Sequence, residues 1–492
     1  MQMIKKTLNN NHLNFNFLQG LALALLTNAI IIPHLIEMNY HPLSIEVIFY
    51  FIIIFIPMFG LGYISNWNIY LFFSSFITYW FFDSFFIDRI VNLLIIVLVI
   101  IFLINWLVDK TIYPLACIIF SLIFILFSIF NYNDEFLVKE KLDTNINYNN
   151  TKLNYSYLHI ILDEHSSLNL IPDEFKDVEF NKRFEKDYIS NNFDLYSNVF
   201  SESHNTVESL GAIFGLYDDE DEHIRKKNYL KKDNKFTVSV KKNFLAQKLR
   251  EKGFKISFIQ SNYYEICDVD RSYKCETYTR ASNMNIFKKY NIQIKQRLKL
   301  ALLAIHEDYY HREHISRLYR KILQFFYGED IRSYGWFSRP LVNVFIFEEM
   351  QKKLNNLKNG EALIAHMLLP HYPFVLNENC NLKEISKWNY PLKENKNETI
   401  ISANKGFLQQ VKCTHKKIQT LLEIASKKDN LLVVIHGDHG ARLYLDTEYQ
   451  NEIDKFSTFI ALKDNNTSGK TINRNMKLQN VFTGFINRNF DN

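Results

Sequence analysis

Long apolar stretches, separated by short polar breaks, fill the N-terminal quarter of the chain. Five of them approach the roughly 20 residues that a helix needs to cross a bilayer core of about 30 Å. They cover residues 16–33, 43–64, 69–87, 90–107 and 111–130. No amphipathic period survives at 91–107, which disfavours a buried helical core in a soluble protein. A cleaved signal peptide would explain only one stretch. The pattern predicts an N-terminal bundle of five transmembrane helices.

The few charged residues in this part of the chain predict its orientation in the membrane. Lys5 and Lys6 precede the first stretch, and Lys110 lies between the fourth and the fifth. Arg89 is the one contrary cation, and it follows Asp88 directly. Because Lys and Arg near the ends of spans tend to stay cytoplasmic, the N-terminus is predicted inside and the polar part of the chain outside.

The remainder of the chain has the pattern of an α/β domain. The predicted division is a transmembrane domain at 1–130, a polar linker at 131–154 and an extracytoplasmic domain at 155–492. Short apolar runs that alternate with helical patterns are typical of α/β architecture. The predicted central strands are 157–162, 254–259, 362–369 and 431–436, and the predicted helices are 241–252, 340–358 and 403–427.

Composition removes two classes of protein. The formal net charge of +5 over 492 residues is too weak a bias for a nucleic-acid-binding protein. An aromatic content of 15% argues against disorder as the dominant state.

Acidic and imidazole side chains follow three of the predicted strands. The first strand runs into Asp163, Glu164 and His165, the strand at 431–436 runs into Asp438 and His439, and the strand at 362–369 runs into His371. Open α/β sheets bind ligands at the carboxyl ends of their strands. Two carboxylates and an imidazole bind a divalent cation such as Zn²⁺ or Mn²⁺, and Mg²⁺ also fits oxygen-rich sites. The alternative for the Asp-His-Gly tripeptide alone is a surface turn.

Two further segments suggest substrate chemistry. His371 lies between Pro370 and Pro373, on a rigid turn that suits a substrate or leaving-group contact. His366 is a weaker candidate for substrate binding because it lies within the strand. Thr206 lies where a polar loop enters a helical pattern, so its hydroxyl could act as a nucleophile beside a helix N-terminus. Ordinary N-capping by Asn205 or Thr206 explains the same spacing equally well.

Cysteine usage is compatible with an oxidising compartment. Cys117 falls in the fifth apolar stretch, which leaves four cysteines in the polar part. We predict the disulfides Cys267–Cys275 and Cys380–Cys413. Four reduced thiols in the core are the alternative, because the number of cysteines alone does not decide between them.

At these residues the sequence resembles the alkaline phosphatase and sulfatase superfamily, and in architecture the membrane-anchored phosphoethanolamine transferases and lipoteichoic acid synthases. The blocks that carry the resemblance are IILDE at 160–164, SHNTVES at 203–209, LLPHYPFV at 368–375 and VVIHGDHGAR at 433–442. The segment at 456–459 resembles the strand that usually follows the last ligands. The resemblance implies a sulfatase-like domain with a mixed central sheet, in a multi-pass protein of the bacterial plasma (inner) membrane.

The resemblance also implies roles for individual residues. Asp163, Asp438 and His439 would bind one divalent metal together with Thr206, the nucleophile. The reaction would move a phosphoalcohol group, of the phosphoethanolamine or phosphoglycerol type, from a phospholipid donor to a surface glycan, lipid or polymer. His371 would assist departure of the leaving group or bind the acceptor. Asn205 and Arg442 would contact phosphate.

Departures from the superfamily pattern leave alternatives open. No C/S-x-P-x-R sequence occurs near Thr206, which disfavours the formylglycine mechanism of sulfatases. Asp163 and Glu164 are adjacent, and successive strand residues point to opposite faces, so Glu164 is kept as an alternative ligand. The alternative functions are a sulfatase-like hydrolase, either a phosphodiesterase or an atypical sulfuric ester hydrolase, and a non-catalytic envelope scaffold.

An insertion at about 279–336 resembles nothing that we can place. Within it, residues 292–304 have the pattern of a basic amphipathic helix, which could rest on an anionic leaflet or pack on the domain surface. His306, His311 and His314 lie among basic residues, so a metal site there is disfavoured.

Overall fold

The computed structural model divides the chain into two compact units. The first comprises Met1–Glu135 and Ser282–Gly335, and the second comprises Phe136–Ala281 and Trp336–Asn492. The residues that the structure describes are 2–37, 40–85, 112–132, 137–141, 153–216, 229–231, 238–261, 263–267, 274–278, 290–309, 338–384, 387–388, 397–443 and 448–491. The polar insertion therefore groups with the apolar N-terminal part.

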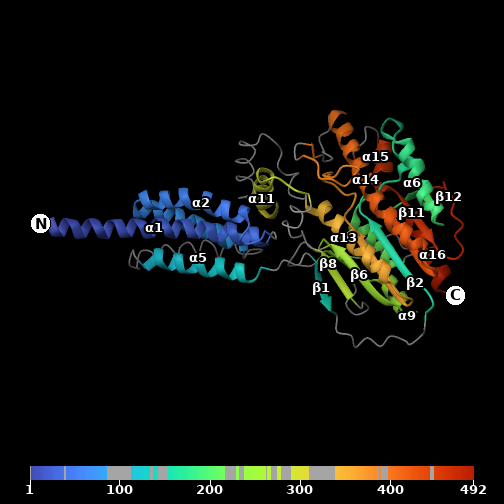
Figure 1. Ribbon diagram of the computed structural model, residues 1–492, viewed down its shortest axis with the longest axis horizontal. Helices are drawn as coiled ribbons and strands as arrows, with labels where there is room; N and C mark the ends of the chain where they lie inside the picture. The colour runs from blue at the N-terminus through green and yellow to red at the C-terminus, as the bar shows by residue number, and fades with distance from the viewer. Residues whose placement is uncertain are drawn as a thin grey trace. The chain divides into compact units, whose positions relative to one another are not determined.

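The first unit consists of long apolar helices and one helix from the insertion (Figure 1). Its elements are α1 (Gln2–Glu37), α2 (Ile45–Ile64), α3 (Trp67–Phe85), α5 (Ile112–Phe130) and α11 (Ile294–Tyr309). Close packing of α1 on α2 needs glycine, because a Cβ at Gly62 would lie 2.7 Å from the carbonyl oxygen of Gln19.

Three helices in the described part of this unit, rather than five, are long and apolar enough to cross a membrane. They are Phe15–Ile36, Ile45–Ile64 and Ile112–Phe130. The third predicted span coincides with α3, of which Trp67–Ile77 forms a shorter apolar helix. The fourth, at 90–107, lies outside the described residues. The number five therefore stays a prediction, whereas the apolar N-terminal helices are present.

A mixed ten-stranded sheet forms the centre of the second unit. Its strands run in the order β1-β8-β6-β9-β2-β10-β11-β3-β12, and β13 pairs with β3. The strands from β8 to β10 are parallel, whereas β11 is antiparallel to β10 and to β3. The bounds are β1 Leu137–Lys141, β2 Ser156–Leu162, β3 Asp194–Phe200, β6 Lys255–Ser261, β8 Lys274–Tyr278, β9 Glu361–Met367, β10 Leu431–Gly437, β11 Ser457–Lys463, β12 Thr471–Ile472 and β13 Met476–Lys477. The mixed central sheet that the resemblance implied is confirmed.

Helices cover the sheet, and a small second sheet accompanies it. The helices are α6 (Val178–Ser190), α7 (Thr206–Gly215), α9 (Phe244–Glu251), α13 (Ser338–Asn356), α14 (Asn397–Ser426), α15 (Glu448–Phe456) and α16 (Leu478–Phe490). Two 3₁₀ turns are η1 (Leu168–Leu170) and η2 (Asp173–Phe175). The small sheet joins β4 (Tyr229–Lys231), β5 (Val238–Val240) and β7 (Tyr264–Glu265).

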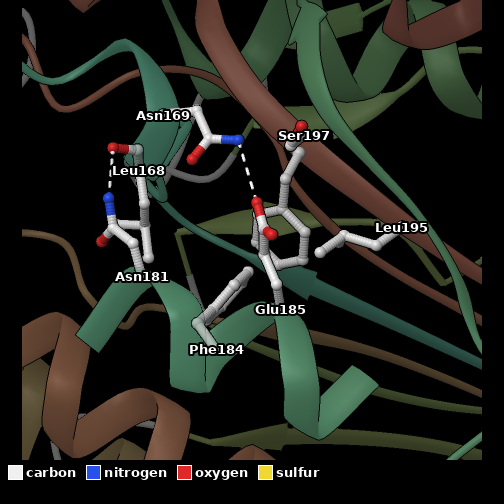
Figure 2. A pocket seen from close by; sticks show the side chains of 8 residues that line it. Leu168, Asn169, Asn181, Phe184, Glu185, Leu195 and Ser197 are labelled. Atoms are coloured by element: carbon white, nitrogen blue, oxygen red, sulfur yellow. Dashed lines mark hydrogen bonds between the residues drawn. The ribbon is translucent and has the colours of Figure 1, made fainter. Parts of the chain in front are cut away.

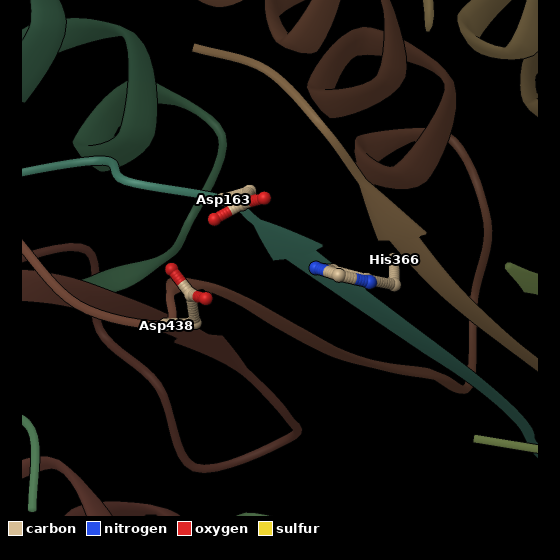
Figure 3. A group of neighbouring side chains, drawn as sticks. All are labelled: Asp163, His366 and Asp438. Carbon is tan, nitrogen blue, oxygen red and sulfur yellow. The ribbon is translucent and has the colours of Figure 1, made fainter. Parts of the chain in front are cut away.

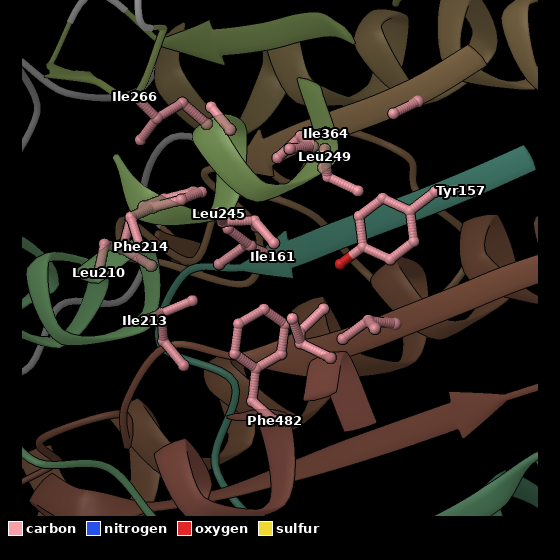
Figure 4. Packing of buried hydrophobic residues seen from close by; sticks show 14 of the residues in the cluster. Tyr157, Ile161, Leu210, Ile213, Phe214, Leu245, Leu249, Ile266, Ile364 and Phe482 are labelled. Carbon is pink, nitrogen blue, oxygen red and sulfur yellow. The ribbon is translucent and has the colours of Figure 1, made fainter. Parts of the chain in front are cut away.

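The core lies where α7, α9 and α16 pack on the central strands (Figure 4). Tyr157 and Ile161 of β2 meet Phe214 of α7, Leu245 of α9 and Phe482 of α16, and each is at most 1% exposed. Central parallel strands are covered on both faces, so β2 reads as a continuous apolar run. This burial fixes the strand ends that carry the polar side chains.

The four predicted central strands are present, with one informative difference. The predicted strand 362–369 ends at Met367 in β9. The backbone N–H of Leu368 donates to Asn343 Oδ1 at 2.7 Å instead of to a strand, and Pro370, two residues later, has no N–H. The chain therefore leaves the sheet before His371.

Both predicted cysteine pairs lie within reach of a disulfide. The Cα atoms are 6.1 Å apart in Cys267–Cys275 and 5.0 Å apart in Cys380–Cys413. The cysteine outside these pairs, Cys117, is in α5. The distances between the paired cysteines confirm the two pairs predicted from the sequence.

Candidate functional site

Two aspartates mark adjacent strand ends. Asp163 follows β2 and Asp438 follows β10, which is the parallel neighbour of β2. The N–H of Asp163 donates to Met367 O at 2.9 Å, and the N–H of Asp438 donates to Leu162 O at 3.1 Å. The sheet hydrogen bonding thus continues by one residue on each strand. Both side chains are buried, with relative exposures of 1% and 0%.

Thr206 brings a hydroxyl to these carboxylates. It is the first residue of α7, and its Oγ1 donates to Asp163 Oδ1 at 3.3 Å. The same oxygen lies 3.2 Å from His439 Nε2. His439 Nε2 lies 3.4 Å from Asp438 Oδ2 and 3.9 Å from Asp163 Oδ1. The four side chains that the sequence predicted as a ligand set therefore meet.

These separations have the scale of a metal coordination shell. Zinc ligands lie about 2.0–2.2 Å from the ion, so the donor atoms of a tetrahedral site are about 3.3–3.6 Å apart. The separations of 3.2 to 3.9 Å among these side-chain atoms bracket this range. Oxygen and imidazole donors also suit a divalent cation. The residues present fit such an ion.

His366 is a further donor beside the aspartates (Figure 3). One ligand atom from each of Asp163, His366 and Asp438 lies within 4.8 Å of the other two. Neither ring nitrogen of His366 has a hydrogen-bond partner among the described residues, and the side chain is 0% exposed. The sequence suggested only substrate binding for His366. In the sheet, His366 pairs with Ile161, which lies two residues before Asp163, so the side chains of His366 and Asp163 lie on the same face of the sheet.

Burial makes the two carboxylates electrostatically unequal. Burial first, and then the charge of Asp163, raises the pKa of Asp438 well above its usual value. For Asp163, burial raises the pKa, but nearby histidines and Arg442 outweigh it, so the net shift is downward. Burial lowers the pKa of His439 to about 4, which keeps the imidazole neutral and able to ligate at pH 7. A divalent cation would compensate the repulsion between the carboxylates.

A second charged cluster lies next to the first. Glu164 forms an ion pair with Arg442, and its Oε1 lies 3.7 Å from His371 Nε2. Its Oε2 accepts a bond from the N–H of Tyr372 at 3.4 Å. Glu164 and Arg442 both have left-handed backbones, with φ of 61° and 57°, which is uncommon for residues other than glycine. The Glu164 side chain, the alternative ligand, thus contacts Arg442 and the His371 turn.

Gln410 of α14 holds the turn that carries His371, and sequence reasoning missed it. Its Nε2 donates to Pro370 O at 3.0 Å and to His371 O at 2.7 Å. Its Oε1 accepts from the N–H groups of Val375 at 3.1 Å and Leu376 at 3.3 Å. Gln410 is 0% exposed. A single glutamine in a long amphipathic helix gives no sequence signal of this role.

The N-cap alternative for the Thr206 segment also holds. Asn205 Oδ1 accepts from the N–H of Glu208 at 2.9 Å, so Asn205 caps α7. Capping orients the first turn and leaves the Thr206 hydroxyl directed at the aspartate and imidazole. The two explanations for this spacing are therefore compatible.

Gly437 and Gly440, which flank Asp438 and His439, provide space rather than an unusual backbone conformation. Neither is among the described glycines with positive φ. Instead, a Cβ on Gly437 would collide with Thr458 Oγ1, and one on Gly440 would collide with Asp454 O. Close approach of the Thr458 side chain and of the backbone at His165 and Asp454 is what requires glycine here.

A small pocket is not part of this site, and three histidines of the insertion are not assigned to it. A small pocket beside η1 and α6 is lined by Asn169, Asn181 and Glu185 among other residues (Figure 2). Asn169 donates to Glu185 there at 3.1 Å, which is a structural contact. His311 and His314 are outside the described residues, and the side chain of His306 is not described.

Comparisons with known proteins give similarities of fold only. No family model and no curated protein matches the chain. Among solved structures it is similar to the zinc-bound C-terminal periplasmic domain of EcEptC from Escherichia coli (12% identity, TM-score 0.36), covering 64% of this chain and 74% of that one. It is also similar to the lipoteichoic acid synthase LtaP from Listeria monocytogenes (11% identity, TM-score 0.37), with coverage of 70% and 74%. A third is the C-terminal periplasmic domain of phosphoethanolamine transferase EptC from Campylobacter jejuni (14% identity, TM-score 0.34), with coverage of 68% and 89%.

These names match the groups that the sequence motifs resemble. At such identities and TM-scores the comparisons assign no activity, so the function is inferred from the site itself.

Proposed function

We propose that the chain is a metal-dependent transferase that moves a phosphoalcohol group from a phospholipid to a cell-surface glycan, lipid or polymer. The observation that carries the proposal is the position of Thr206 Oγ1, 3.3 Å from Asp163 Oδ1 and 3.2 Å from His439 Nε2. A buried hydroxyl at a helix N-terminus, within a set of metal-binding side chains, suits nucleophilic attack on phosphorus.

In this proposal Asp163, Asp438, His439 and Thr206 hold one divalent cation, with His366 and Glu164 as alternative ligands. When bound, such an ion favours the alkoxide form of a hydroxyl and stabilises negative charge on phosphoryl oxygens. A catalytic zinc site with four such donors can expand to five-coordination, so a substrate oxygen would join them as the fifth ligand. Zn²⁺, Mn²⁺ and Mg²⁺ all remain candidates.

The proposed reaction has two displacements at phosphorus. Thr206 Oγ1, whose proton would be lost to solvent when the cation binds, forms a bond to phosphorus, and the bond from phosphorus to the diacylglycerol oxygen breaks. His371 gives a proton to that leaving oxygen, and Glu164, whose Oε1 lies 3.7 Å from His371 Nε2, orients the imidazole. A hydroxyl of the acceptor then attacks phosphorus and gives its proton back to His371, and the bond from phosphorus to Thr206 Oγ1 breaks.

Anionic substrate groups have positive partners nearby. The N-terminus of α7 presents the positive end of the helix dipole at Thr206. Arg442, whose side chain is 24% exposed, has the charge and geometry to contact a phosphate. Asn205 is proposed as a further phosphate contact.

The proposed setting is a multi-pass protein of a bacterial plasma membrane, with the catalytic domain outside the cytoplasm. The apolar helices of the first unit and the two cysteine pairs of the second support this setting. The phospholipid donor would then be present in the same membrane.

The test is transfer of a labelled headgroup from phospholipid by the purified full chain, with mass spectrometry of the peptide that contains Thr206. We expect a phospho-adduct on Thr206 that disappears in Thr206→Ala and persists in Thr206→Ser. Ser190→Ala, which removes an exposed hydroxyl at the end of α6, is the matched control and should leave the adduct unchanged.

Two outcomes would replace the proposal. Release of soluble labelled product at the same rate with and without an acceptor would indicate a hydrolase. An unchanged adduct in Thr206→Ala would exclude Thr206 as the nucleophile, and failure of the folded protein to bind any divalent metal would favour a scaffold.

A further inference from the structure

Among the described residues, the insertion contributes helix α11 to the first unit. Helix α11 contacts α1 and α2, beside which it appears in Figure 1. Along the chain, the segment that contains α11 is flanked on both sides by parts of the second unit. A segment that lies between two parts of the second unit along the chain therefore packs on helices that are apolar enough to span a membrane.

A buried ion pair fixes the level of α11 on the bundle. Glu46 lies in the first turn of α2 and is 0% exposed. Arg297 Nε of α11 lies 2.5 Å from Glu46 Oε1. One turn further along α2, the hydroxyl of Tyr50 donates to Leu298 O at 2.8 Å. A buried carboxylate without a cation is costly, so this pair ties α11 to the first turn of α2.

The first turn of α2 is also an end of a candidate span. The apolar segment begins at Ile45, and Ser44 caps the helix through a bond from the N–H of Val47. Because an apolar span starts where the hydrocarbon core starts, Glu46 lies close to the level of the headgroups. Arg297 and the first turns of α11 are therefore at that level too.

The chemistry of α11 suits a phospholipid surface. Ile294 is 52% exposed and Lys295 beside it is exposed, whereas Leu300 and Ala301 are buried against the bundle. No acidic residue occurs in its first turn, and the segment from 295 to 299 carries three cations. An exposed aliphatic side chain next to a cation is the pattern of a helix that lies in the membrane interface.

We propose that α11 is an interfacial helix that binds the phosphate groups of anionic phospholipids in the leaflet at the level of the first turn of α2. Ile294 enters the leaflet, Lys295 contacts headgroups, and the Glu46–Arg297 pair holds the helix at that depth. The proposal rests on α2 being a membrane span and not on the chemistry of Thr206. Its failure would leave the transfer and adduct experiments unaffected.

The test places a fluorophore on α11 in the full chain. The chain carries Cys117→Ser, so that Ile294→Cys is the labelled thiol, and is reconstituted in phosphatidylcholine vesicles with or without phosphatidylglycerol. Quenching by lipids that carry a nitroxide on the headgroup reports contact with the membrane surface. Val178→Cys on α6, where the native side chain is 54% exposed, is the matched control in the second unit.

We expect strong quenching at position 294 and weak quenching at 178, with preference for labelled phosphatidylglycerol over labelled phosphatidylcholine. One cation near an anionic surface contributes about a fivefold preference, so Lys295→Gln should reduce the preference about fivefold. Equal quenching at 294 and 178 would overturn the proposal. So would a preference that is unchanged in Lys295→Gln.

The ion pair has its own test in the same assay. Glu46→Gln should lower quenching at 294, and the exchange of Glu46→Arg with Arg297→Glu should restore it. If the single variant fails to fold, the exchanged pair and Lys295→Gln still decide the matter. Quenching that is the same in Glu46→Gln and in the native chain would contradict the assigned role of the pair.

Discussion

The replacement Gln410→Leu tests whether one buried side chain positions the turn that carries His371. Leucine has a similar size but makes none of the four hydrogen bonds that link Gln410 to Pro370, His371, Val375 and Leu376. The N–H of Val375 keeps a second partner, Pro373 O, at 2.9 Å. Three buried backbone groups therefore lose a partner outright.

The loss of these three hydrogen bonds determines the expected decrease in stability. A typical internal hydrogen bond contributes about 1 kcal/mol net, so the variant should lose about 3 kcal/mol of unfolding free energy. If the turn shifts to reach water instead, the stability loss shrinks but His371 moves. Either way the catalytic rate constant should fall more than the affinity for the lipid donor, because His371 acts on the leaving group in the proposed reaction.

Gln410→Glu is the matched variant, because it keeps an acceptor for Val375 and Leu376 but faces two carbonyl oxygens with a carboxyl group. The folded state should favour the protonated carboxyl and raise its pKa above about 4.3. More protons are then bound when folded than when unfolded, so stability should fall as the pH rises through the folded pKa. Denaturant unfolding of the full chain in detergent, followed by near-UV circular dichroism, measures both variants. A loss below about 0.5 kcal/mol in Gln410→Leu, with unchanged transfer kinetics, would refute the reasoning.

Three further predictions concern the site and its support. Asp438→Asn should weaken zinc binding at least about tenfold by calorimetry, because it removes one of two buried anionic donors; unchanged affinity would exclude Asp438 as a ligand. A chelator should abolish headgroup transfer, and added Zn²⁺ or Mn²⁺ should restore it; full activity in the chelator would contradict metal dependence. Burial lowers the pKa of His165 from 6.5 to about 4, so the folded state binds fewer protons than the unfolded state in this window, and stability should be lost as the pH falls from 6.5 towards 4. For one such group the loss is on the order of 3 kcal/mol, and it should shrink in His165→Gln; an equal acid sensitivity in that variant would assign the effect elsewhere.

The sequence was sufficient for the parts of the fold that depend on continuous burial. The runs at 157–162 and 431–436 became β2 and β10 because central parallel strands are covered on both faces and must be apolar throughout. Edge strands gave no such signal. The polar strand β1 and the short β12 carry no continuous apolar run and are defined by pairing with their neighbours, so their sequences could not predict them.

The candidate site was predictable where the chemistry follows a strand end. Asp163 and Asp438 were expected together because parallel strands end at one edge, and their N–H groups continue the hydrogen bonding there. The sequence did not predict that His366 lies beside the two aspartates or that Gln410 binds the His371 turn. Their positions depend on strand register and on the packing of α14, which are long-range properties that a local pattern does not contain.

The most direct test of the central claim is a crystal structure of the protein soaked with zinc, with anomalous scattering measured at the zinc edge. We expect one ion within about 2.0–2.2 Å of Thr206 Oγ1, His439 Nε2 and a carboxylate oxygen of each of Asp163 and Asp438. An ion bound elsewhere, or bound here with Thr206 Oγ1 well outside coordination distance, would contradict it.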